Sequence, residues 1–146
     1  MRSGVGLWSE LLREHNTVDK RFSHVGIVIC GENGKFMVLH SEGDDVTGQG
    51  KVCLEPVEAF IAESDCIGIS RLNYADPDKM ADAAMNYLGR KFDWKFDIDD
   101  HDAIYCTELI ALALQDSSDC RLKKTNGFID VEACLDPEIF TEIIIP

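Results

Sequence analysis

Two β-rich segments separated by a short loop most constrain the fold of this chain. Residues 23–30 read SHVGIVIC and residues 35–42 read KFMVLHSE, with GENG between them. Valine, isoleucine and phenylalanine favour strands, and a glycine-containing loop between two such runs is typical of a β-hairpin. The sequence therefore predicts an antiparallel hairpin in the first third of the chain.

Other segments predict a sheet with helices packed against it. Residues 66–72 (CIGISRL) predict a strand, and residues 76–89 predict a helix with Asp76 as N-cap, Pro77 in the first turn and Gly89 as the stop. We also expect a short strand before Pro56, helices over 7–15, near 56–63 and over 104–115, an aromatic and acidic loop over 90–102, and a final strand over 141–146. Because the strands are mostly consecutive, they should pair antiparallel. The expected fold class is α+β.

Length and charge narrow the possible partners. The chain has 146 residues, of which 45% are hydrophobic, and a formal net charge of −13. This length fits a single domain over residues 1–146 with a real core. An acidic surface repels nucleic-acid phosphates and anionic lipid headgroups, so we expect neither as a partner. The oligomeric state is not indicated.

The sequence shows neither a membrane span nor an export signal. It has no run of 18 apolar residues, and its start, MRSGVGLWSELLREHNTVDKR, lacks the apolar stretch of a signal peptide. We therefore expect a cytoplasmic protein with reduced thiols, unless a leader was removed beforehand. The cysteines are widely spaced and form no CxxC pair, which argues against a zinc knuckle and a thioredoxin-like site; they stand at positions 30, 53, 66, 106, 120 and 134.

Cys106 differs from the other cysteines because it stands at the first turn of a predicted helix. Apolar residues follow it at helical spacing in the segment DAIYCTELIALAL. The unpaired N–H groups of a helix N-terminus lower the pKa of a thiol, and the thiolate is the nucleophilic form. The Cys106 N–H could also form half of an oxyanion hole. The alternative is a structural cysteine at the edge of the buried helix face.

The hairpin supplies candidate partners for this thiol. His24 and Gly26 share one face of the first strand, and the small glycine leaves space for another side chain to approach. Pairing residue 30 with either 34 or 36 places His24, His40 and Glu42 on one face. A two-residue turn at Asn33-Gly34 would separate them, so this grouping requires a longer or bulged loop. The expected roles are Cys106 as nucleophile, His24 as base and His40, or alternatively Glu42, as the residue that orients the base.

Four motifs taken in order, FSHVGIVI, VLHSEG, YLGRKFDWKF and DAIYCTELI, resemble the permuted branch of the NlpC-type papain-like cysteine amidases and peptidases (the YiiX-like branch). The resemblance runs from about Leu7 to the DPEIF segment. It includes the permuted order, since His24 precedes Cys106 by 82 residues (106 − 24). It implies a circularly permuted papain-like fold, with an antiparallel sheet packed against helices, and the same three site residues, Cys106, His24 and His40.

The resemblance also implies supporting roles and reveals departures. Glu108 and Tyr105 match positions that support the helix start and the pocket. Many relatives have Glu where this chain has His40, and many have Tyr where it has Phe92. Relatives usually begin with a strand, and MRSGVG contains nothing like it.

Two metal sites compete with the hydrolase interpretation. Asp97, Asp99 and Glu108 fit the spacing of a calcium loop, but Asp102 stands where such a loop requires glycine, so a solvated loop is the better interpretation. Zinc bound by His24, His40 and Cys106 is chemically reasonable, although their spacings match no compact zinc motif. We expect no metal and no organic cofactor.

The preferred function is a cysteine-dependent hydrolase that forms an acyl-thioester on Cys106. The resemblance implies two substrate classes: amides of peptides, including peptides of the cell-wall type, and lipid amides or esters. The acidic surface favours neutral or cationic substrates. A module that binds a peptide, a lipid or zinc without catalysis is the alternative from a different class.

Overall fold

The predicted hairpin forms, and its loop is longer than two residues. The computed structural model describes residues 1–4, 7–62 and 64–143. Strands β1 (Ile27–Cys30) and β2 (Phe36–Asp44) pair antiparallel with Cys30 opposite Phe36. The Gly31 N–H donates to the Lys35 carbonyl and the Gly34 N–H donates to the Gly31 carbonyl, with Gly34 at a φ of 74°. This three-residue loop is a turn followed by a left-handed glycine, and it gives the even register that the site hypothesis requires.

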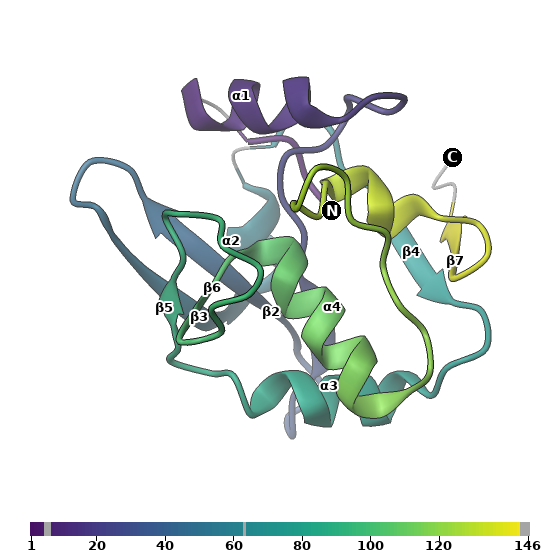
Figure 1. Cartoon of the computed structure of the whole chain (residues 1–146). Coiled ribbons are helices and arrows are strands. Elements are labelled where there is room, and N and C mark those ends of the chain that lie inside the picture. The colour runs from purple at the N-terminus through teal and green to yellow at the C-terminus, as the bar shows by residue number, and fades with distance from the viewer. Residues whose placement is uncertain (5–6, 63, 144–146) are drawn as a thin grey trace.

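The main sheet extends from this hairpin in the order β1-β2-β3-β5-β6 (Figure 1). The added strands are β3 (Gln49–Pro56), β5 (Lys91–Phe92) and β6 (Ala103–Ile104). The predicted loop over 90–102 therefore contains one short strand and leads into another. All strand pairs in this sheet are antiparallel except β5 and β6, which are parallel because the ten residues between them let the chain turn back and run in the same direction. A separate two-stranded antiparallel sheet consists of β4 (Ile69–Leu72) and β7 (Phe140–Ile143).

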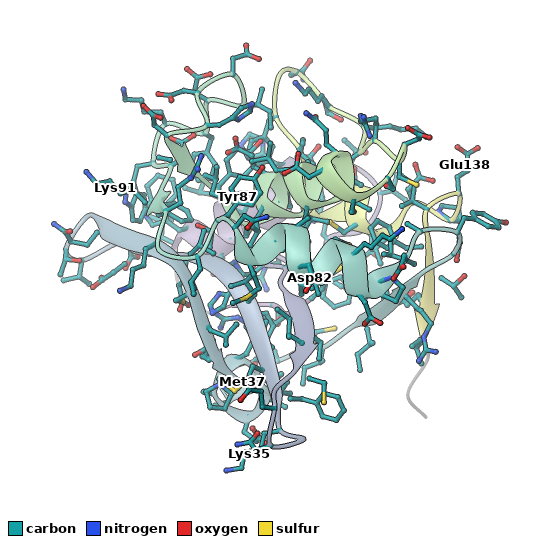
Figure 2. All side chains as sticks on the ribbon, turned by 90° about the horizontal axis from the view of Figure 1, so that it is seen from below. Lys35, Met37, Asp82, Tyr87, Lys91 and Glu138 are labelled. Atoms are coloured by element: carbon teal, nitrogen blue, oxygen red, sulfur yellow. The ribbon has the colours of Figure 1, made fainter. Side chains whose placement is uncertain are left out.

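Helix α4 (Cys106–Ser117) passes through the centre of the molecule, with α3 (Pro77–Met85) packed against it (Figure 1). Eight of its twelve residues are buried, which explains its apolar sequence. In the view from below, Asp82 lies on the outer side of α3, and Lys35 and Met37 lie at the far end of the hairpin (Figure 2). The other helices are α1 (Leu7–His15), α2 (Val57–Ile61) and the 3-10 helix η1 (Val131–Leu135), which was not predicted.

Element boundaries moved by a few residues from their predicted positions. Helix α3 begins as expected, since the Asp76 carboxylate accepts the N–H groups of Asp78 and Lys79, but it ends at Met85 and the chain turns on to Gly89, whose φ is 84°. Strand β1 is four residues shorter at its start than predicted, and β4 is three residues shorter. Parts of the predicted helix at 56–63 and of the final strand at 141–146 lie outside the described residues.

The first four residues also take part in the sheet region, where no strand was predicted. Arg2 forms single β-bridges with His24 and with Ile67. Its position beside His24 brings a positive charge to the candidate site. Among the described residues, no helix combines the length and the apolar character that crossing a bilayer requires.

Candidate active site

Cys106 is the first residue of α4, which begins two residues later than the predicted helix over 104–115, and it is 6% exposed. The Glu108 carboxylate accepts the Tyr105 N–H at 3.3 Å and thereby closes the first turn of the helix. All six cysteines are free thiols. Cys106 thus stands at a well-defined helix N-terminus with its sulfur in no disulfide.

The pKa of Cys106 differs from the expectation for a helix start. Burial raises the pKa of the thiol to about 11, while hydrogen bonds from the amides of Val25, Thr107 and Cys106 itself lower it in part. The helix-terminal amides therefore act in the predicted direction, but desolvation outweighs them. The Val25 amide reaches the sulfur from the residue that follows His24, so the start of the hairpin lies directly beside α4.

His24 and His40 form a direct pair. His24 Nε2 lies 2.8 Å from His40 Nδ1, and the two rings meet edge to face with centroids 5.1 Å apart. The Phe60 ring packs against both, with centroid distances of 5.6 Å to His24 and 5.1 Å to His40. The bond leaves Nδ1 as the free nitrogen of His24. His24 and Cys106 both line one cleft, so the structure brings these two predicted site residues to the same cavity.

Behind His40, the carboxylate of Glu55 completes a chain of hydrogen-bonding groups. His40 is 0% exposed, and its Nε2 lies 2.9 Å from Glu55 Oε1. A carboxylate only accepts, so His40 carries its proton on Nε2 and accepts the His24 proton at Nδ1. Nothing in the sequence singled out Glu55. The register of β2 with β3 is the signal that could have found it. This register places His40 opposite Cys53 and Val38 opposite Glu55, so the His40 imidazole and the Glu55 carboxylate lie on the same face of the sheet.

Glu42, the alternative third residue, is turned to a different partner. Its Oε1 accepts a hydrogen bond from Arg2 Nη2 at 2.7 Å, and its side chain is 44% exposed. Its second oxygen lies 4.0 Å from His40 Nε2. His40, and not Glu42, therefore contacts His24.

Both imidazoles of the pair are neutral at physiological pH. Burial, the neighbouring His40 and the positive charges of Arg2 and the N-terminus hold the pKa of His24 well below its ordinary value. Burial and Arg2 lower the pKa of His40 to about 4. A neutral His24 with a free Nδ1 can accept a proton, which is the requirement for a general base.

The cleft is lined by both aromatic and charged side chains. It lies where α1, the N-terminal residues, the end of β2 and the loop after β5 meet at Cys106. Trp8 of α1 contacts Trp94 edge to face at 5.9 Å, and Trp94 contacts Phe92 at 4.7 Å. Glu42, Asp45 and Arg2 provide the charges. The cleft can therefore hold an apolar group and a cationic or amide group together.

The two supporting residues lie behind the cleft. Glu108 is 0% exposed and contacts His101 Nδ1 at 2.8 Å, and burial raises its pKa to about 7. The Tyr105 hydroxyl accepts the Ile129 N–H at 3.2 Å. Neither residue lines the cleft, so their contacts hold the start of α4 in place.

Neither metal set considered from the sequence is assembled. Glu108 is engaged with His101 and Tyr105, and the Asp97 carboxylate accepts the N–H of Asp99 within its own loop, so the calcium-loop spacing does not correspond to a cage. Among residues 1–4, 7–62 and 64–143, one group of three potential ligands does converge, and it comprises His40, Glu42 and Cys53. It shares only His40 with the predicted zinc set.

Comparison with known proteins supports the fold. The family model described as a permuted papain-like amidase enzyme, YaeF/YiiX, C92 family, matches residues 8–133. The crystal structure of the metalloprotein yiiX from Escherichia coli O157:H7 matches with a TM-score of 0.79 at 18% identity, over 99% of this chain and 93% of that chain. No curated protein sequence matches the chain. The permuted papain-like α+β fold predicted from the motifs is thereby confirmed.

Proposed function

The chain belongs to the permuted papain-like amidase family of YaeF and YiiX, and on that premise we propose that it is a cysteine amidase with Cys106 as nucleophile and His24 as general base. The observation that carries the assignment is the shared cleft. His24, with one nitrogen engaged by His40 at 2.8 Å and the other free, lines the same cavity as Cys106. A nucleophile, a base and an orienting group are the parts that covalent acyl transfer needs.

The reaction begins with both groups neutral, since burial disfavours the thiolate and the imidazolium alike. His24 Nδ1 takes the Cys106 proton as the sulfur attacks the substrate carbonyl. The N–H groups at the start of α4 stabilise the negative charge that develops on the carbonyl oxygen. His24 then returns the proton to the leaving amine, an acyl-thioester remains on Cys106, and water activated by His24 releases the acid.

His40 and Glu55 are positioning residues in this scheme. Glu55 holds the Nε2 proton of His40, and His40 Nδ1 in turn holds the Nε2 proton of His24. The His24 lone pair is thereby fixed on Nδ1. A histidine that is oriented and held in one tautomer by a second polar group is the arrangement of other nucleophile–base–orienter sites.

The walls of the cleft favour a peptide amide as substrate. The indole and phenyl rings of Trp8, Trp94 and Phe92 offer apolar contact, and the Asp45 carboxylate can accept hydrogen bonds from a substrate N–H or a cationic amine. A lipid acyl ester or amide is the second candidate, since the same aromatic wall can hold an alkyl chain. The two differ in what Asp45 would contact.

Turnover of small substrates tests the proposal. The native protein, Cys106→Ala and His24→Ala are compared on fluorogenic peptide amides and on fatty acyl esters of matched leaving group. Each variant should lose at least about 100-fold in kcat, because each lacks a group that moves a proton or forms a bond. Cys120→Ala, which removes a thiol distant from the cleft lining, serves as control and should retain native turnover. Equal turnover in all four proteins would refute the assignment, and a preference for the acyl esters would select the lipid alternative.

A further inference from the structure

A second cluster of reactive groups lies on the far side of His40 from His24. Three donor atoms, from His40, Glu42 and Cys53, lie within 4.8 Å of one another. Around His40 Nε2, the Cys53 sulfur lies at 3.5 Å, Glu55 Oε1 at 2.9 Å and Glu42 Oε2 at 4.0 Å. The proposed chemistry uses the Nε2 side of His40 only to fix a proton, and it leaves Cys53 and Glu42 without a role.

The spacing of these atoms suits a tetrahedral zinc ion. Zinc binds imidazole nitrogen and carboxylate oxygen at about 2.0–2.1 Å and thiolate at about 2.3 Å, which separates the ligand atoms by roughly 3.3–3.6 Å. The Cys53 sulfur, at 3.5 Å from His40 Nε2, lies within this range, and Glu42 Oε2, at 4.0 Å, lies slightly beyond it. His40, Cys53 and Glu42 would supply one N, one S and one O ligand, since their ligand atoms lie within 4.8 Å of one another.

Charge and access are also suitable. The carboxylates of Glu42 and Glu55 lie close enough to the Cys53 thiol to oppose its ionisation, and the one cation bonded to them among the described residues is Arg2, on Glu42. A divalent cation would therefore relieve the repulsion between Glu42 and Glu55. His40 is 0% exposed and forms the floor, while Glu42 is 44% and Glu55 26% exposed at the rim. The ion could enter from solvent past these two side chains.

We propose that His40, Cys53 and Glu42 form a zinc site behind the base, and that zinc bound there switches off the Cys106 chemistry. Coordination needs the lone pair of His40 Nε2, so the proton on this nitrogen leaves to solvent together with the thiol proton of Cys53. The bridging proton then moves from His24 Nε2 to His40 Nδ1, and His24 takes up a proton on Nδ1. Each ring again carries one proton, and the net release is the Cys53 proton.

This exchange of tautomers blocks the base. With its proton on Nδ1, His24 faces Cys106 as a donor and has no lone pair there to accept the thiol proton. The inhibitory half of the inference rests on the proposed function, while the binding half does not. Zinc ligation that fixes the tautomer of a histidine through its other nitrogen is a general property of such sites.

Metal binding is tested without reference to activity. Zinc bound per chain is measured by equilibrium dialysis, and Co²⁺ is used to detect the thiolate-to-metal absorption band, in the native protein, Cys106→Ala, Cys53→Ser and Cys30→Ser. We expect one ion per chain and a thiolate band in the native protein, Cys106→Ala and Cys30→Ser, with both lost in Cys53→Ser. Cys30 is the matched control because it is an exposed free thiol of β1, in the same sheet but separated from β3 by β2. A band that disappears in Cys106→Ala and survives in Cys53→Ser would overturn the site.

Inhibition is tested by the rate at which a thiol-directed electrophile labels Cys106. Zinc should slow labelling of the native protein at least about 100-fold, the contribution of a general base, and a chelator should restore the rate. Cys53→Ser should be labelled at the same rate with and without zinc. If zinc slows this variant equally, the ion binds in the substrate cleft and the inference is wrong. If Cys106 fails to label in metal-free protein while the dialysis result holds, the proposed function fails and the zinc site stands.

Discussion

Removing the Glu55 carboxylate should weaken His24 as a base, because Glu55 acts on His24 through His40. In Glu55→Ala, the Nε2 proton of the fully buried His40 loses its acceptor at 2.9 Å. Leaving a buried donor unpaired costs about 1–3 kcal/mol. The ring can avoid this cost by carrying its proton on Nδ1 and donating to His24, but His24 then holds its own proton on the nitrogen that should accept from Cys106.

The size of the effect follows from that cost. A shift of about 1–3 kcal/mol in favour of the unproductive tautomer corresponds to a roughly 5- to 150-fold loss of rate. Glu42 Oε2 lies 4.0 Å from His40 Nε2, and if it moves in as a substitute acceptor the loss will fall at the lower end. Glu55→Gln keeps an oxygen that can accept the same proton, so it should retain most of the native rate.

Electrophile labelling of Cys106, followed by mass spectrometry at pH 7.5 in the presence of a chelator, measures this effect without a known substrate. Glu58→Ala, an exposed glutamate on the adjoining helix α2, is the control and should label at the native rate. The tautomer explanation would be refuted if Glu55→Ala labelled like the native protein while His40→Ala was strongly impaired. In that case His40 orients His24 without help from the carboxylate.

Three further results are expected. Although burial opposes it, the backbone N–H groups of residues 17–19 donate to Glu132 and lower its pKa from 4.5 to about 2. The stabilisation that the Glu132 carboxylate provides is therefore complete above pH 4.5 and is lost as the pH falls toward 2. In urea unfolding, Glu132→Gln should be about 3 kcal/mol less stable than the native protein at pH 7 and equal to it near pH 2. Burial raises the pKa of Glu108 from 4.5 to about 7, so the stabilisation from its protonated form is present below pH 4.5 and is lost as the pH rises to 7. Between pH 4.5 and 7, the free energy of unfolding of the native protein should fall by about 3 kcal/mol relative to that of Glu108→Gln. A Cβ added at Gly26 would lie 3.0 Å from His40 Cβ, so the free energy of unfolding of Gly26→Ala should be about 1–3 kcal/mol lower and an electrophile should label Cys106 more slowly. Unchanged stability would show that this strand contact is loose.

Local sequence signals were sufficient where a structure depends on neighbouring residues. Asp76 and Pro77 begin α3 because an aspartate side chain caps free N–H groups and proline has no N–H to leave unpaired. Cys106 begins α4 for the same local reasons of periodicity and capping. The β-rich runs predicted the hairpin, although the glycine at position 34 did not by itself indicate the length of the loop.

The pKa of Cys106 shows where local reasoning stopped being sufficient. The amides at the start of α4 lower it, as any helix terminus would, yet burial raises the pKa to about 11 because α4 passes through the middle of the fold. Burial depends on what the rest of the chain places around a residue, and no short segment contains that information.

By itself, the sequence determined the hairpin, helices α3 and α4, the thiol at the start of α4 and the imidazole at the mouth of the hairpin, because these follow from residue type and spacing, whereas β5, β6 and η1 were not predicted. Only the tertiary structure decided that His40 and not Glu42 contacts His24, and that Glu55 stands behind them. These contacts depend on the registers of β1, β2 and β3, where a shift of one residue turns every side chain to the opposite face. The register is set by loops and packing over the whole sheet, so the chemistry of the site is fixed only when the fold is complete.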